Sequence, residues 1–182
     1  MENNQNKNDL PSKAHAEAES SPPYPPVSIS EKNRLYGLEM LDNFGGENSE
    51  MTAVSLYLYN NLTLNEKFPE AARQFFKVNR AEMRHLQIFG ELAALLGCDP
   101  RLWTHNTSAG MRYWSPIYVT YEEFLSDILK TAIASEKRTI EKYRRQAELI
   151  RDEKITAILE RIIIDEQEHI RIFEAMRNSR FV

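Results

Sequence analysis

Residues 155–176 read ITAILERIIIDEQEHIRIFEAM, a segment with the apolar period of an amphipathic helix. Its large apolar side chains recur three or four positions apart and form one stripe: Ile155, Ile158, Leu159, Ile162, Ile172 and Met176. Glu166 and His169 fall inside this stripe, where a helix in a protein core would carry Leu or Ile. A carboxylate and an imidazole three residues apart lie on the same helix face, so both can bind one metal ion.

The same pattern occurs once earlier in the chain. Glu82-x-x-His85 matches Glu166-x-x-His169, and in both copies Ile-Phe begins three residues after the histidine. Glu82 and His85 also lie in the apolar stripe of their own segment. The chain therefore contains two related helices, each with a Glu-x-x-His on its apolar face.

A second element of the repeat precedes each of these helices. Glu50 and Glu136 each follow a serine, and each stands seven residues before a tyrosine, Tyr57 or Tyr143. From this glutamate to the Glu-x-x-His glutamate, the separation is 32 residues in the first half and 30 in the second. Glu136 lies in an apolar stripe, and the repeat implies the same for Glu50, although the residues before Glu50 do not share its phase.

Four carboxylates that converge in a core need counter-charge. Burying one isolated ion is costly, and four like charges also repel one another. Two divalent cations would supply a formal charge that cancels all four. Oxygen-rich coordination with one imidazole per metal suits iron or manganese better than structural zinc.

The remaining sequence predicts an all-α fold. No glycine follows Gly110 and no proline follows Pro116, so the C-terminal part is helical. One helix of 66 residues would be about 99 Å long, so the segment must fold back, with Asp152 as the N-cap of its second helix. We expect four helices at about 30–63, 68–97, 121–150 and 153–178. The link 98–119 is long enough to be a crossover along a four-helix bundle, between its second and third helices.

Two segments of this plan are irregular. Gly45-Gly46 interrupts the first helix, which is either kinked there or divided into two pieces. Residues 1–27 hold five of the eight prolines and few apolar side chains, so we interpret them as a disordered tail. A strap that docks through Tyr24 is the alternative. Residues 28–182 form the single folded domain.

Composition excludes several classes of protein. A formal net charge of -4 and a pI near 5.7 argue against nucleic-acid binding. No apolar run is long enough for a membrane span, and the first residues lack the apolar core of a signal peptide. One cysteine, Cys98, excludes an internal disulfide framework and a four-cysteine metal site. We therefore expect a cytoplasmic protein without membrane or nucleic-acid partners.

With these motifs in place, the sequence resembles the ferritin-like di-iron or di-manganese carboxylate superfamily, of the rubrerythrin and bacterioferritin type. The resemblance covers about residues 35–178, and it implies a ferritin-like four-helix bundle. It implies six metal ligands, all present: Glu50, Glu82, His85, Glu136, Glu166 and His169. By this resemblance the first three would serve one metal and the last three the other, with Glu82 and Glu166 bridging.

The sequence departs from rubrerythrins in two respects. It has no rubredoxin domain, and Thr139 stands where rubrerythrins carry an extra glutamate. Asp165 resembles an aspartate that holds the imidazole of the second helix in related sites, and its other interpretation is a surface carboxylate. Tyr57 and Tyr143 are either core tyrosines with a satisfied hydroxyl, which is the favoured interpretation, or hydrogen-bond donors to the ligands, or redox-active residues.

The resemblance implies a redox enzyme of the peroxidase or ferroxidase type. Two iron ions per chain, or manganese as the alternative, would react with hydrogen peroxide or O₂, and an external electron donor would reduce them again. Iron oxidation and storage, or peroxide dismutation as in manganese catalases, are the alternative functions. We also expect a homodimer.

Overall fold

The computed structural model describes residues 22–106 and 110–179. Five α-helices make up most of it, accompanied by one short 3₁₀ helix, Pro116–Tyr118, and two short strands. The α-helices are α1 (Arg34–Gly45), α2 (Glu50–Leu64), α3 (Pro69–Leu95), α4 (Leu125–Leu149) and α5 (Glu153–Asn178). None of the helices in these residues is long and apolar enough to cross a membrane.

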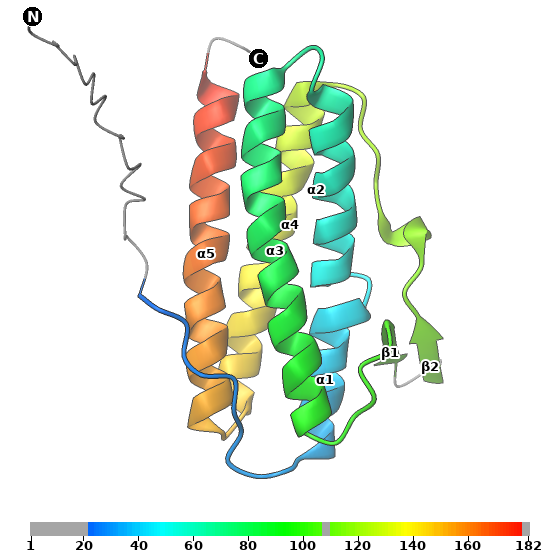
Figure 1. Cartoon of the computed structure of the whole chain (residues 1–182), viewed down its shortest axis with the longest axis vertical. Helices are drawn as coiled ribbons and strands as arrows, with labels where there is room; N and C mark the ends of the chain where they lie inside the picture. The colour runs from blue at the N-terminus through cyan, green and yellow to red at the C-terminus, as the bar shows by residue number, and fades with distance from the viewer. Residues whose placement is uncertain (1–21, 107–109, 180–182) are drawn as a thin grey trace, which may run out of the picture.

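The helices form a four-helix bundle with a long crossover, as the sequence predicts (Figure 1). In Figure 1, α1 and α2 lie end to end and together occupy one position of the bundle beside α3. The chain runs up α2, down α3, back along the outside of the bundle, down α4 and up α5. The crossover is what allows α3 and α4 to run in the same direction.

The glycine pair in the middle of the first predicted helix shows why this helix is two pieces. At Gly46, a Cβ would lie 2.6 Å from the backbone oxygen of Asp42, so no side chain fits there. Ser49 then caps α2, because its hydroxyl accepts a hydrogen bond from the Thr52 amide. The helix therefore restarts at Glu50, and this N-terminal position of α2 sets where the Glu50 carboxylate points.

Other predicted boundaries agree closely with the structure. Helix α5 begins after Asp152, whose carboxylate accepts from the Lys154 amide as an N-cap. The crossover, however, contains an antiparallel pair of strands, β1 (Trp103–Asn106) and β2 (Gly110–Tyr113), that was not predicted. Trp103 pairs with Tyr113, and such a short pair carries too few residues for an alternating pattern to be recognised.

The apolar core is divided into two clusters. One lies in the half of the bundle that contains α1 and is centred on residues such as Phe89, Leu92 and Ile158. The other lies in the half that contains α2, around Phe75 and Phe173. Along α3, α4 and α5 the polar side chains of the repeat lie between the two clusters, so the polar site forms a layer across the middle of the bundle.

The interpretation of residues 1–27 as a disordered tail is wrong for its last part. Residues 22–30, which we call the strap, lie along α5 (Figure 1). Tyr24 and Val27 pack against the core, and the Arg161 guanidinium donates to the Pro22 carbonyl at 2.5 Å. The proline content does not prevent docking, because the extended strap makes its contacts mainly through side chains and carbonyl groups. Residues 1–21 lie outside the described part of the chain.

Candidate metal centre

The structure brings the six predicted site residues together in the middle of the bundle. Helix α2 supplies one glutamate and α4 another, while α3 and α5 each supply a Glu-x-x-His. All six side chains are buried, and His169, the most exposed of them, is only 4% exposed. They are Glu50, Glu82, His85, Glu136, Glu166 and His169.

Two overlapping groups within the six could each hold one metal ion. In each group, one donor atom per residue lies within 4.8 Å of the donor atoms of the other members. Glu82 and Glu166, the shared glutamates, belong to both groups. Glu50 belongs only to the group of His85, and Glu136 only to the group of His169; we call this pair the outer glutamates. This grouping has the connectivity expected of a pair of metal ions bridged by two carboxylates.

The imidazole rings are oriented for this role. Nδ1 of His85 lies 3.2 Å from a carboxylate oxygen of each shared glutamate. Nδ1 of His169 lies 2.9 Å from an oxygen of each shared glutamate. Both rings therefore present Nδ1 to the carboxylates, and Nε2 points away from the centre of the site.

Burial and like charge act together on the outer glutamates. Desolvation raises the pKa of Glu50 and of Glu136 well above the ordinary value, and the nearby shared glutamates raise both further. In the absence of metal, these two carboxyl groups therefore favour the protonated form.

The shared glutamates show the opposite balance. Burial alone would raise the pKa of Glu82, but His169 and then His85 hold it well below its usual range. The pKa of Glu166 is also lowered by the imidazoles, against the effects of burial and of Glu82. Burial would lower the pKa of both imidazoles, but the carboxylates raise it well above 6.5. Without metal, the shared glutamates and the imidazoles thus form two buried ion pairs.

Two tyrosines connect the halves of the repeat. The Tyr57 hydroxyl, on α2, donates to the Glu136 carboxylate on α4, and the Tyr143 hydroxyl, on α4, donates to Glu50 on α2. Burial raises the pKa of both phenols well above 10, so they remain donors. Each of these residues is therefore a core tyrosine that also donates a hydrogen bond to an outer glutamate.

Asp165 and Tyr24 lie on the outer side of His85. A carboxylate oxygen of Asp165 is 3.2 Å from Nε2 of His85, and Arg161 holds the other oxygen at 2.6 Å. The Tyr24 hydroxyl is 2.8 Å from the same Nε2. Asp165 is thus a partner of the imidazole rather than a surface carboxylate. In the sequence, the one signal for Tyr24 was an aromatic residue within a run of prolines.

The donor set fits two divalent cations. Oε1 of Glu82 and Oε1 of Glu166 are buried without a partner in hydrogen-bond geometry, although Nδ1 of His169 lies 2.9 Å from the first and Nδ1 of His85 lies 3.2 Å from the second. A buried carboxylate oxygen without such a partner is costly, and a cation between the two groups would satisfy both. Four carboxylates and two imidazoles offer each ion an oxygen-rich site with one nitrogen, as iron and manganese prefer.

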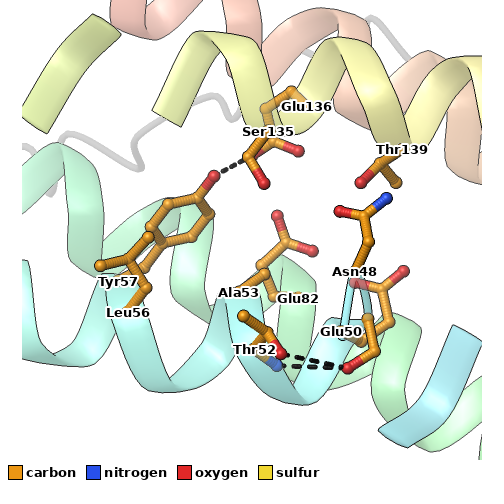
Figure 2. Close-up of a pocket in the computed structure, with 11 residues that line it drawn as sticks. Asn48, Glu50, Thr52, Ala53, Leu56, Tyr57, Glu82, Ser135, Glu136 and Thr139 are labelled. Atoms are coloured by element: carbon orange, nitrogen blue, oxygen red, sulfur yellow. Dashed lines mark hydrogen bonds between the residues drawn. The ribbon is translucent and has the colours of Figure 1, made fainter. Parts of the chain in front are cut away.

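A small cavity adjoins the site on the side of the outer glutamates (Figure 2). Its volume is about 20 Å³, which is room for roughly one water-sized molecule. Figure 2 shows Glu50, Glu82 and Glu136 at this cavity, with Thr139 on the opposite wall from Thr52. The small volume admits a small molecule and excludes a large one.

Fold and site together define a ferritin-like di-metal carboxylate protein. Residues 47–177 match the family model of rubrerythrin, and the chain belongs to the rubrerythrin family. This confirms the resemblance inferred from the repeat. A search of curated protein sequences found no match.

Solved structures with the same fold include a catalase and two bacterioferritins. The manganese catalase KatB from Anabaena is 21% identical over 82% of this chain and 74% of its own, with a TM-score of 0.72. The bacterioferritin BfrA of Mycobacterium tuberculosis is 23% identical over 80% of this chain and 86% of its own, with a TM-score of 0.65. The bacterioferritin of Desulfovibrio desulfuricans, which has a di-iron site, is 22% identical over 81% of this chain and 83% of its own, with a TM-score of 0.64. Such similarity establishes the shared fold.

Proposed function

We propose that the six buried residues bind two iron ions and that the protein reduces hydrogen peroxide or O₂ with electrons from an external donor. The observation that carries this proposal is the pair of overlapping four-residue groups with two shared glutamates. A bound pair of redox-active metal ions would supply two electrons to the oxidant in one site.

The residues of the chain would hold and shield this pair. The shared glutamates would bridge the two ions, and each outer glutamate and each imidazole would bind one of them. Tyr57 and Tyr143 would keep the outer glutamates in place through their hydroxyl groups. The cavity of about 20 Å³ would let a molecule of the size of peroxide or O₂ reach the glutamate side of the site and keep larger molecules out.

The electron donor would be a separate molecule. Beyond the two groups described, the described residues hold no other cluster of side chains that could bind a metal. The single cysteine of the sequence cannot form a redox disulfide within the chain. Reduced metal would therefore have to be regenerated from outside.

Dismutation of peroxide by a manganese pair is the second candidate. It is supported by the structural similarity to the manganese catalase from Anabaena and by a ligand set that suits manganese as well as iron. In this reaction one peroxide is reduced and another is oxidised to O₂, so no external donor is needed. Iron oxidation and storage is a further alternative, in view of the similarity to bacterioferritins.

Peroxide turnover by metal-loaded protein separates these functions. The protein would be loaded with Fe(II) or Mn(II) without oxygen, then mixed with peroxide in an oxygen electrode. Peroxide loss without O₂ release, sustained only when a reductant is added, is the expected result. O₂ release from the manganese form would favour dismutation, and an iron core that grows under air would favour storage. Glu166→Ala, which removes a shared glutamate, should lose this turnover, and Glu168→Ala, a change beside the site on the surface of α5, is its matched control.

We further propose that the protein is a homodimer. Large apolar side chains on α2 and α3 are exposed, among them Leu62 at 67% and Met83 at 55%. A second copy could cover them. Native mass spectrometry should give twice the chain mass, and a monomer would contradict this assembly.

A further inference from the structure

The strap is fixed to α5 at both of its ends. At one end the Arg161 guanidinium donates to the Pro22 carbonyl at 2.5 Å. At the other end the Ser30 amide donates to the Asp152 carboxylate at 2.7 Å. Between these points Tyr24 turns toward the bundle, so the residue is carried to the site by the strap and does not belong to a bundle helix.

The Tyr24 ring lies between two cations. The guanidinium carbon of Arg84, on α3, is 4.0 Å from the ring centroid, and that of Arg161, on α5, is 4.1 Å from it. Guanidinium groups at such distances attract the face of an aromatic ring. Two helices of the bundle therefore hold the ring, and they direct its hydroxyl inward.

The Tyr24 hydroxyl completes the outer support of His85. It donates to the Asp165 carboxylate and lies 2.8 Å from Nε2 of His85. Nδ1 of the same ring faces the shared glutamates. To bind metal through Nδ1, the neutral imidazole must carry its proton on Nε2, which then donates to Tyr24 and Asp165. The hydroxyl and the carboxylate thus fix both the tautomer and the ring orientation.

His169 has no comparable support. Within the described residues, its Nε2 has no hydrogen-bond partner, whereas its Nδ1 faces the shared glutamates. The repeat explains the difference: Asp165 precedes Glu166, but the equivalent position before Glu82 is Ala81. Ala81 and His169 both line an open groove of about 490 Å³, next to Tyr24. The two imidazoles are therefore unequal, although the residues facing the metal ions repeat.

We propose that Tyr24 is a positioning residue for the metal ion held by His85, and that the strap thereby makes the two metal positions unequal, with the His85 position the tighter one. This inference rests on the proposed binding of two metal ions. The strap then has a role in retaining the ion beside His85. The ion beside His169, next to the open groove, is the more easily exchanged of the two.

Stepwise Mn(II) binding to the full chain tests this role. Free Mn(II) is followed by its six-line electron paramagnetic resonance signal in the absence of oxygen. The wild type should bind two ions with unequal constants. Tyr24→Phe should weaken one of the two constants roughly 10- to 100-fold, the effect typical of removing an outer partner of a metal-bound histidine. The other constant should change less than about twofold, since no hydrogen bond among the described residues joins His169 to Tyr24.

Tyr36→Phe is the matched control. Tyr36 is another partly buried tyrosine, whose hydroxyl accepts from the Arg151 amide far from the six site residues. Loss of the Tyr36 hydroxyl should leave both Mn(II) binding constants unchanged. Tyr24→Ala, which also removes the ring between the two arginines, should weaken binding at least as much as Tyr24→Phe.

A double-mutant cycle separates positioning from a general structural role. With His85→Gln, adding Tyr24→Phe should have no further effect, and with His169→Gln it should have its full effect. Unchanged constants in Tyr24→Phe, or an equal loss at both positions, would overturn the role of Tyr24. A wild type that binds no Mn(II) and no Fe(II) would instead overturn the proposed di-metal function, and this inference with it.

Discussion

In the proposed di-metal centre, protons and metal ions would compete for the same six side chains. Without metal, the two shared glutamates are ionised and the two imidazoles protonated, and the two outer glutamates favour the neutral form. Two negative and two positive charges make this cluster neutral. With two divalent cations, four ionised carboxylates and neutral imidazoles, the cluster is neutral again. Metal binding can therefore proceed as an exchange of protons for cations, without leaving net charge in the core.

The shared and outer glutamates should respond differently to truncation. Glu166→Ala removes a carboxylate that both groups use, so affinity for both ions should fall by at least roughly 100-fold, more than outer partners usually contribute. Glu136→Ala should mainly lower the affinity for the ion beside His169. Metal analysis after dialysis gives the two stoichiometries, with Glu168→Ala as the control. Tight binding of two ions by Glu166→Ala would show that this glutamate does not bridge them.

Most of the six residues were accessible from the sequence because they interrupt apolar stripes. Glu136 and Glu166 each have several turns of their own helix before them, so their phase can be read. Glu50 could only be inferred from the repeat, and the structure gives the reason. Helix α2 begins at Glu50, so no preceding turn of the same helix shows its phase. Tyr24 could not be placed because its contacts join it to residues about 60 and 140 positions away.

At the level of elements, capping residues determine where the chain turns. Asp152 caps α5 and also accepts from the strap through Ser30, so one carboxylate holds two elements. Its pKa is lowered, because the hydrogen bonds from Ser30 and Lys154 outweigh the effect of burial. The sequence predicted the cap from local pattern alone, and it could not predict the contact with the strap, which lies 122 residues earlier.

Asp152→Ala should therefore destabilise the fold and release one end of the strap, while the six site residues stay on their helices. Loss of an N-cap lowers the free energy of unfolding by about 0.5–2 kcal/mol, and loss of the Ser30 contact adds to it. Asp152→Asn, which keeps an acceptor, should retain much of the stability. Chemical denaturation of the wild type and the two variants in metal-free form gives their free energies of unfolding. Metal analysis of the variants should still find two ions per chain. An unchanged stability of Asp152→Ala would mean that the cap contributes little to the fold.

The crossover is the element that local sequence described least well. Its two strands pair within a segment that also packs against α1, near Gly45. A Cβ on Gly45 would lie 3.0 Å from the Trp103 amide nitrogen, so the glycine pair that divides the first helix also makes room for the crossover. A contact between segments this far apart leaves no local pattern in the sequence, whereas the long helices can be predicted from their own apolar period.

For the whole molecule, the buried cluster should make the metal-free protein less stable as the pH rises. The outer glutamates and the imidazoles have raised pKa values, so the native state keeps protons that the unfolded chain releases above about pH 4.5 and 6.5. The stability due to these groups is fully present at lower pH and is lost as the pH rises through their native pKa values. The shared glutamates, with lowered pKa values, act in the opposite direction, below about pH 4.5.

Thermal melts of the metal-free protein from about pH 5 to about pH 8 check this dependence. The melting temperature should fall with pH, and metal-loaded protein should lack the fall because bound cations keep the carboxylates ionised. Replacing both outer glutamates by Gln should make the slope shallower. The same change at two exposed positions, Glu47 and Glu141, should not. Parallel curves for all variants would indicate that the outer glutamates do not hold protons in the fold.

The most direct measurement for the whole account is the number of metal ions bound per chain. Protein dialysed to equilibrium against Fe(II) without oxygen should bind two ions per chain, as the two overlapping groups require. The variant with both Glu82→Gln and Glu166→Gln should bind none tightly, because it lacks both shared carboxylates. A wild type that binds one ion or none, or a double variant that still binds two, would contradict the assignment of these six residues as a di-metal centre.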